Sequence, residues 1–255
     1  MVNISAVIIT LNEEDKIGRC IDSLTSVADE IIVVDSFSTD NTKKICEAKG
    51  VRFIEHSFEG YVKQKNLAAD AANHDFILSI DADEELSEPL IKEILKVKNN
   101  FLADGYEFNR LNNYCGTWIH HSGWYPDRKL RLYNRTKGKW GGTTIHEKIE
   151  MQPGATVEHL NGDLLHYSYL TISEHVAQAN KFSGLGAESA LSKGRKATVL
   201  AAVINPFWRF VRNYFFKLGF LDGYYGFVVC IINSHENFLK YIKMLELQKK
   251  EKSMS

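Results

Sequence analysis

The sequence lacks several features that would place it in common functional classes. Its 31 basic and 32 acidic side chains leave a net charge of -1, so there is no overall positive charge of the kind that binds nucleic acid. It has no GxGxxG stretch after its first apolar run and no GxxxxGKS or GxxxxGKT stretch, so the usual dinucleotide fingerprint and the P-loop are excluded. Neither apolar run in the last quarter of the chain reaches the ~20 residues that cross a bilayer.

Secretory features are also missing. The four cysteines, Cys20, Cys46, Cys115 and Cys230, include no CxxC pair, which favours reduced thiols in a cytosolic protein. The first residues have neither the charged start nor the long apolar stretch of a signal peptide. We therefore expect the protein on the cytoplasmic side.

Apolar runs and helical patterns alternate through about the first eighty residues. Runs typical of buried strands cover 4–9, 31–34, 51–54 and 75–81. A helical pattern follows each of the first three, and the earliest extends from Ile17 to Val27. This alternation predicts an α/β fold with a mostly parallel sheet flanked by helices.

The fourth run ends in a cluster of acids. Phe76 to Ile80 are followed by Asp81 and Asp83 with one alanine between them. In open α/β sheets the ligand crevice lies outside the carboxyl ends of the strands, and residues two apart in a strand point to the same side. A divalent cation relieves the repulsion between such carboxylates and completes its shell with substrate phosphates. The alternative is a strand that stops in a solvated acidic turn.

Four stretches between Ile4 and about Leu86 carry a family resemblance. In order, VIITLNEE, IIVVDSFSTDNT, KQKN and FILSIDADEE resemble the successive motifs of inverting family-two glycosyltransferases with the Rossmann-like GT-A fold. The resemblance implies a transferase that uses a nucleotide-diphosphate sugar and a divalent metal, Mn²⁺ or Mg²⁺. It assigns the metal to Asp83 and the nucleotide sugar to Thr10, Asn12, Glu13, Asp35, Lys65 and Asp81.

Three positions depart from the family pattern. Ser36 stands where a second acid is usual, and Phe37 stands where a glycine is usual, which leaves the contact with the nucleobase open. Lys65 stands in place of an arginine. It keeps the positive charge but loses the bidentate fork of a guanidinium.

The segment from Cys115 to Trp140 is rich in aromatic and basic residues. Aromatic rings meet the C–H faces of sugars, and arginine forks meet phosphates. The stretch WYPDRKLRLYNR, followed by Trp140 and IHEK, resembles a bacterial subgroup that extends lipopolysaccharide core or related envelope glycans. We expect acceptor contacts from Trp124, Arg128, Arg131 and Trp140; for the tryptophans, the alternative is core packing.

An inverting transfer needs one base to deprotonate the acceptor hydroxyl group. By position in the family, Glu147 is the expected base, because it follows a glycine-rich stretch suited to a loop over the cleft. Asp127 is the reserve candidate. His166 is either an ordinary hydrogen-bonded histidine or, by analogy with other GT-A enzymes, an additional metal or diphosphate ligand.

The last part of the chain differs in composition. Six cations and no acid lie between Lys193 and Leu221, interleaved with aromatic residues. Arg209, Arg212 and Lys217 fall roughly on one helical face, a pattern typical of a basic amphipathic helix in a membrane interface. The alternative is a helical pair that packs on the catalytic domain or on a second subunit.

The sequence thus predicts a GT-A domain over 1–190 and a C-terminal amphipathic, membrane-facing helical segment over 191–255. The expected activity is inverting transfer of a hexose, with UDP-hexose as the first donor to test, onto a glycolipid or lipopolysaccharide-type acceptor at the inner face of the cytoplasmic membrane. The alternatives are a phosphohydrolase of haloacid-dehalogenase type and a non-catalytic nucleotide-sugar-binding protein. The oligomeric state and the identity of the sugar are not fixed by the sequence.

Overall fold

The structure, a computed structural model, describes residues 1–143 and 146–254 and divides into two compact units. The first contains Met1–Arg110 and Asp127–His166, and the second contains Leu111–Pro126 and the chain from Tyr167 onward. Two strands, β6 (Gly105–Tyr114) and β11 (Val157–Tyr169), contribute residues to both units. These units differ from the predicted division between residues 190 and 191, which stays a prediction about function.

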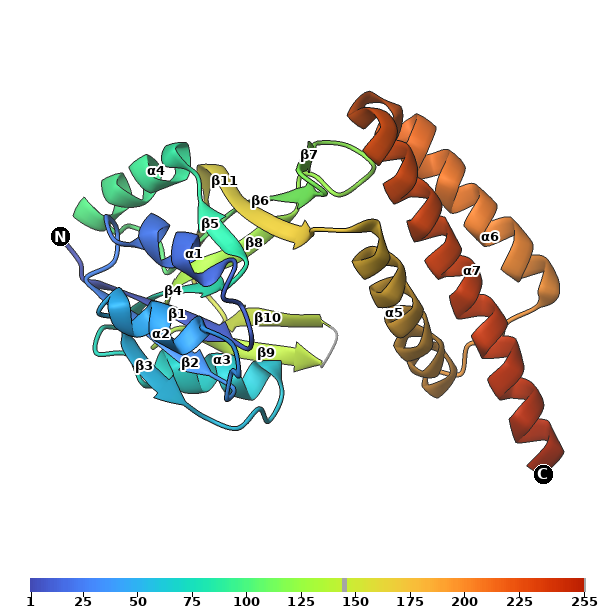
Figure 1. Cartoon of the computed structure of the whole chain (residues 1–255), viewed down its shortest axis with the longest axis horizontal. Coiled ribbons are helices and arrows are strands. Elements are labelled where there is room, and N and C mark those ends of the chain that lie inside the picture. The colour runs from blue at the N-terminus through green and yellow to red at the C-terminus, as the bar shows by residue number, and fades with distance from the viewer. Residues whose placement is uncertain (144–145, 255) are drawn as a thin grey trace. The chain divides into compact units, whose positions relative to one another are not determined.

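The first unit begins with the predicted alternation of strands and helices (Figure 1). Its elements are β1 (Ile4–Thr10), α1 (Ile17–Leu24), β2 (Glu30–Asp35), α2 (Thr42–Ala48), β3 (Arg52–Glu55), α3 (Tyr61–Asp70) and β4 (Phe76–Asp81). The four strands are parallel in the order β3-β2-β1-β4. The predicted α/β fold is therefore confirmed, and the carboxyl ends of these strands meet at one edge of the sheet.

Beyond β4 the sheet is antiparallel where its pairing is described. The following elements are β5 (Glu84–Leu86), α4 (Glu88–Asn99), β6, β7 (Thr117–Ile119), β8 (Arg128–Asn134) and β11. β8 pairs with both β4 and β6 in antiparallel register. For β6 and β8 this fits the absence of a helix in the described residues between them, because parallel neighbours need a long crossover, usually a helix. β8 therefore begins at the edge where β4 ends and brings its first residues to the acids there.

Both faces of the sheet in the first unit are covered by apolar side chains. One face packs against α1, α2 and α4, and the other packs against α3 and a separate hairpin of β9 (Gly138–Thr143) and β10 (His146–Met151). Residues next to each other in β1 alternate between the two layers, with Ile8 in the first and Val7 in the second. Since the faces are filled, the edge at the carboxyl ends of β1, β2 and β4 is where polar side chains gather.

The second unit is mainly helical. It contains β7, α5 (Ile172–Ser192), α6 (Val199–Val211), the π-helical turn η1 (Arg212–Phe216), the 3₁₀ turn η2 (Gly219–Asp222) and α7 (Gly223–Met254). Thr171 and Thr198 cap the first turns of α5 and α6 with their hydroxyl oxygens. Within the described residues, no single helix is long and apolar enough to cross a membrane. The segments Val199–Phe216 and Gly219–Lys250, bent by 73°, meet that criterion of length and composition only as a pair.

Candidate active site

Two loops at the carboxyl ends of β1 and β2 are tied together by hydrogen bonds. The backbone N–H of Asn12 donates to Ser38 Oγ at 2.7 Å, and Asn12 Oδ1 accepts from the N–H of Thr39 at 2.8 Å. Asp35, buried at the end of β2, accepts from the N–H and the hydroxyl group of Ser38. Asn12 and Phe37 hold positive φ angles of 55° and 64°, a left-handed backbone conformation that is uncommon for residues other than glycine.

Thr10 and Glu13 lie beside this loop pair. The hydroxyl oxygen of Thr10 is buried and has no hydrogen-bond partner among the described residues. Glu13 lies 3.2 Å from Lys16, and its pKa is raised, mainly by burial and also by the charge of Asp83. The predicted nucleoside-binding residues therefore cluster at one edge, with Glu13 within electrostatic reach of the acids after β4.

Asp81 is held between two buried cations. Its carboxylate lies 2.7 Å from Lys65 Nζ and 2.9 Å from an Arg131 nitrogen. Burial alone would raise the pKa of Asp81, but Lys65 and Arg131 outweigh it and hold this pKa well below its usual range. Asp81 is thus ionised and paired with Lys65 and Arg131. Of the two aspartates, Asp83 is the one that remains available to a metal.

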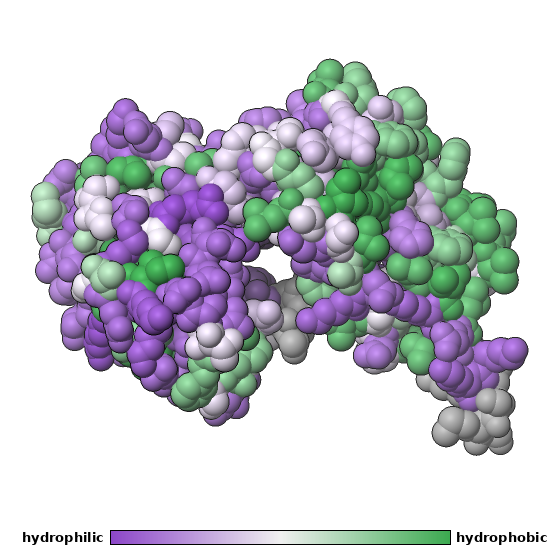
Figure 2. All heavy atoms as spheres, viewed as in Figure 1, coloured by the Kyte–Doolittle hydropathy of each residue, from purple (hydrophilic) through white to green (hydrophobic). Residues whose placement is uncertain are grey.

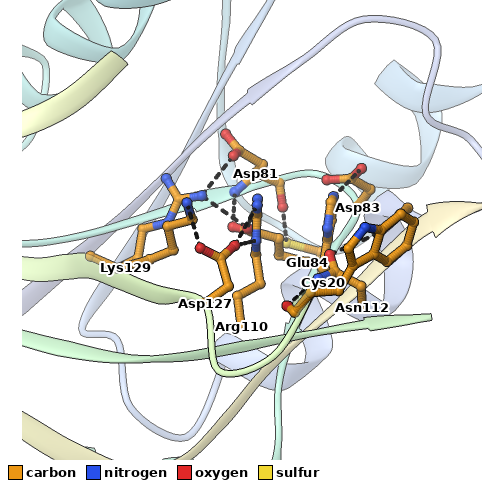
Figure 3. A network of polar contacts seen from close by, with 12 residues as sticks. Cys20, Asp81, Asp83, Glu84, Arg110, Asn112, Asp127 and Lys129 are labelled. Carbon is orange, nitrogen blue, oxygen red and sulfur yellow. Dashed lines mark hydrogen bonds and ion pairs between the residues drawn. The ribbon is translucent and has the colours of Figure 1, made fainter. Parts of the chain in front are cut away.

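A chain of alternating charges continues from Arg131 (Figure 3). Glu84, fully buried, lies 2.9 Å from Arg131 and 3.6 Å from Arg110, and it also accepts the backbone N–H of Asp81. Arg110 donates through two nitrogens to Asp127, whose other oxygen lies 2.9 Å from Lys129. Glu84, Arg110 and Lys129 were not among the site residues predicted from the sequence, although the acidic run after β4 was a signal for Glu84.

The buried charges in this chain give a stability prediction. Replacing Glu84 by alanine leaves Arg131 with less negative charge in a buried setting, so we expect the free energy of unfolding to fall by about 3–5 kcal/mol. Urea denaturation measures this change in the free energy of unfolding. Glu59→Ala, which removes an exposed pair with Lys63, is the matched control and should leave the free energy of unfolding nearly unchanged. Equal stability of the two variants would mean that the Glu84 charge is not needed for the fold.

Trp140 packs beneath the two cations that hold Asp81. Its ring centroid is 4.3 Å from Lys65 Nζ and 5.5 Å from Arg131 Cζ, both within cation–π range. Asn66 of α3 exchanges two hydrogen bonds with the backbone of Trp140. Trp140 and Arg131 are each only 4% exposed, so neither offers a surface to an acceptor sugar here, and their contacts instead position Lys65 and Asp81.

Asp83 and His166 form the candidate metal centre. Asp83 Oδ2 lies 3.1 Å from His166 Nε2, with His166 delivered by β11. Burial opposes ionisation of Asp83, but the histidine outweighs it and lowers the Asp83 pKa. Within the described residues there is no group of three or more acidic, histidine or cysteine side chains suited to a metal. A carboxylate with an imidazole suits Mn²⁺, whose other positions substrate phosphates and water can fill, so the residues fit such an ion.

The two candidate bases have different surroundings. Asp127 has both oxygens engaged by Arg110 and Lys129, so neither is directed to a substrate. Glu147 lies on β10 opposite Gly142 and is half-buried. Its charge, with those of Asp81 and Asp83, raises the pKa of the Tyr61 phenol group. The assignment of the base to Glu147, with Asp127 in reserve, stays a prediction.

The two remaining predicted acceptor residues make contacts of their own. Arg128 is exposed and pairs with Glu107 at 3.2 Å. Trp124 belongs to the second unit, where its ring packs near Tyr114, Tyr169 and His175. Acceptor binding by Arg128 and Trp124 stays a prediction.

The chain is similar to known glycosyltransferases. The family model described as glycosyl transferase family 2 matches residues 5–152. An uncharacterized glycosyltransferase of Rickettsia typhi is 33% identical over all of this chain and 90% of its own length. The lipopolysaccharide core biosynthesis glycosyltransferase LpsC of Rhizobium meliloti is 30% identical over 95% of this chain and 92% of its own. The glucosyl-3-phosphoglycerate synthase of Mycobacterium tuberculosis, solved with Mn²⁺, UDP and glucosyl-3-phosphoglycerate, is 26% identical over 44% of each chain, with a TM-score of 0.36.

Proposed function

The chain belongs to glycosyl transferase family 2, and its fold is the predicted GT-A type; on this basis we propose that it transfers a hexose from a UDP-hexose, with inversion, to a lipid-linked or lipopolysaccharide-type acceptor. The observation that carries the proposal is the Asp83–His166 pair next to the Lys65–Asp81 ion pair at the carboxyl end of β4. The relationship to LpsC supports the acceptor class. Family membership excludes the phosphohydrolase alternative.

Each group in the site has a distinct task in this reaction. Asp83 and His166 would hold a metal ion, which would supply positive charge to the leaving diphosphate. Lys65, fixed by Asp81 and Trp140, adds a second positive charge nearby. Glu147 takes the proton of the acceptor hydroxyl group as that oxygen attacks the anomeric carbon. The bond from the anomeric carbon to the diphosphate oxygen breaks on the opposite face, so the configuration inverts and UDP leaves.

A donor screen tests the donor class. The full chain is titrated with UDP-, GDP- and dTDP-sugars with and without Mn²⁺, and binding is followed by thermal shift. We expect Mn²⁺-dependent stabilisation by UDP-glucose or UDP-galactose, since ligands that bind only the folded state raise its stability. A protein that binds the donor but never releases UDP from it would be the non-catalytic alternative.

The second unit has a surface suited to a lipid layer, where a lipid-linked acceptor is found. The outer face of α6, defined as Val199, Leu200, Val203, Ile204, Phe207 and Trp208, is between 51% and 72% exposed. These positions repeat at helical spacing, while Ala202 and Pro206 on the opposite side are buried. Figure 2 shows hydrophobic residues gathered over this part of the chain.

Charge favours an anionic lipid surface over a second copy of the chain. Arg212 and Lys217, both exposed, follow the outer face of α6, and no acid lies between residues 193 and 221. Two-fold pairing of this face would bring like charges together, whereas an anionic leaflet would neutralise them. We therefore propose that the protein works as a peripheral enzyme on the inner face of the cytoplasmic membrane.

Co-sedimentation with vesicles tests the membrane proposal. We expect the full chain to bind anionic vesicles and to be released by salt, because salt screens exposed charges. Arg212→Gln/Lys217→Gln, which removes two positive charges, should lower binding by about thirtyfold, since each cation contributes about 1 kcal/mol near an anionic leaflet. Phe207→Ser/Trp208→Ser should lower it at every salt concentration. The membrane proposal is contradicted if the unaltered chain stays in the soluble fraction with every vesicle and at every salt concentration. If it then forms a dimer that Phe207→Ser/Trp208→Ser dissociates, the outer face of α6 is a self-association surface.

A further inference from the structure

An exposed aromatic pair lies at the start of α3, outside the residues assigned so far. Phe58 is 50% exposed and Tyr61 is 47% exposed. Their ring centroids are 5.1 Å apart with an interplanar angle of 74°, an edge-to-face contact that fixes the orientation of one ring against the other. Phe58 therefore braces Tyr61 while leaving nearly half of Tyr61 open to a ligand.

The helix directs Tyr61 toward the candidate active site. Tyr61 and Lys65 are four residues apart in α3, so they share one helical face, and Lys65 on that face reaches Asp81 at 2.7 Å. The pKa of Tyr61 is raised by partial burial and then by the charges of Glu147, Asp81 and Asp83. The phenol group is thus within electrostatic reach of the candidate base and of the acids after β4.

These surroundings define the chemistry of the ligand. The carboxylate of Glu147, the candidate base, accepts hydrogen bonds from hydroxyl groups. An exposed aromatic face packs against apolar C–H groups. A neutral ring that carries both C–H groups and hydroxyls, as a pyranose does, satisfies both demands.

We propose that Tyr61, braced by Phe58, is a stacking platform for the pyranose ring at the reaction centre and so contributes to sugar specificity. The inference rests on the proposed function, because it assumes that a sugar enters this edge of the sheet. The bound pyranose is either the sugar of the donor or the terminal sugar of the acceptor, since both present C–H groups and hydroxyls. The nucleoside is not the candidate, because its predicted residues lie in the loops after β1 and β2.

Calorimetric titration of the full chain with Mn²⁺ separates the sugar from the nucleotide. For Tyr61→Ala we expect the affinity for UDP-glucose or UDP-galactose, whichever the unaltered chain binds more tightly, to fall about three- to tenfold, the usual worth of an aromatic contact. The affinity for UDP should change less than twofold. Tyr61→Phe keeps the platform and should stay near the unaltered value. Leu102→Ala, which truncates an exposed side chain elsewhere in the first unit, is the control and should change neither affinity.

A second experiment measures the rate of sugar transfer to truncated-core lipopolysaccharide as the acceptor. Unchanged donor affinity with a three- to tenfold higher KM for this acceptor, in Tyr61→Ala but not in Tyr61→Phe, would place the acceptor sugar on the platform. The proposal is overturned if Tyr61→Ala matches the unaltered chain in both the titration and the transfer assay, or if the affinities for UDP and for UDP-hexose fall equally. Failure of the unaltered chain to bind any nucleotide sugar would instead overturn the proposed function, and the platform with it.

Discussion

Replacing Asp83 by asparagine should lower Mn²⁺-dependent turnover by about 10²–10³-fold, because a catalytic metal contributes several kcal/mol to stabilising the transition state. A neutral amide oxygen is a weaker ligand than a carboxylate, and His166 alone would then hold the ion. The fold should survive, since Asp83 lies in the turn after β4 and its side chain is 24% exposed. The measurement is the initial rate of UDP release as a function of Mn²⁺ concentration, with the unfolding temperature recorded beside it.

Asp75 provides the matched control for this prediction. It lies just before the other end of β4, is largely exposed and pairs with Arg135, so Asp75→Asn removes the same charge far from the reaction centre. We expect that variant to keep its rate and its Mn²⁺ dependence. Full activity of Asp83→Asn in chelator-treated buffer would end the assignment of the metal to this residue.

Glu147→Gln should lower turnover by about 10²–10⁴-fold, the usual contribution of a general base, while the affinity for the nucleotide sugar stays nearly constant. Glutamine keeps the shape of the side chain but cannot accept the acceptor's proton. The split between turnover and binding is what distinguishes loss of a base from loss of a binding contact. Steady-state kinetics with a saturating donor, combined with calorimetric titration, measure both.

Two neighbouring substitutions make the Glu147 result specific. Glu150→Gln alters the same strand at an exposed position and should leave turnover unchanged. Asp127→Asn should cost much less than Glu147→Gln, because both oxygens of Asp127 are engaged by Arg110 and Lys129. If Asp127→Asn instead produced the large loss and Glu147→Gln did not, the role of base would pass to Asp127.

The parallel half of the sheet was predictable because its signals are local. Buried strands in a parallel sheet need apolar residues at nearly every position, and 4–9 and 31–34 both have that composition. The acids that end β2 and β4 then follow from the rule that ligands bind at the carboxyl ends of parallel strands. Asp81 and Asp83 could be located in this way without knowledge of any other strand.

The interior of the site was not predictable because it depends on contacts between distant residues. Antiparallel pairing of β8 with β4 brings Arg131 to Asp81, fifty positions away, and no local pattern specifies that pairing. Trp140 was expected to meet a sugar, yet packing of the β9–β10 hairpin on α3 buries it beneath Lys65. Tyr61 was overlooked although its spacing of four residues from Lys65 was a usable signal.

Inverting transfer of a hexose is tested most directly by proton NMR of a UDP-α-hexose. The donor is incubated with the full chain and Mn²⁺ in the presence of truncated-core lipopolysaccharide. The anomeric proton reports both the breaking of the bond to the diphosphate and the configuration of the new bond. We expect loss of the donor signal, release of UDP and a newly formed β-linkage. Retention of the α-configuration would contradict the inverting mechanism, and an unchanged spectrum for every UDP-hexose would contradict the proposed transfer itself.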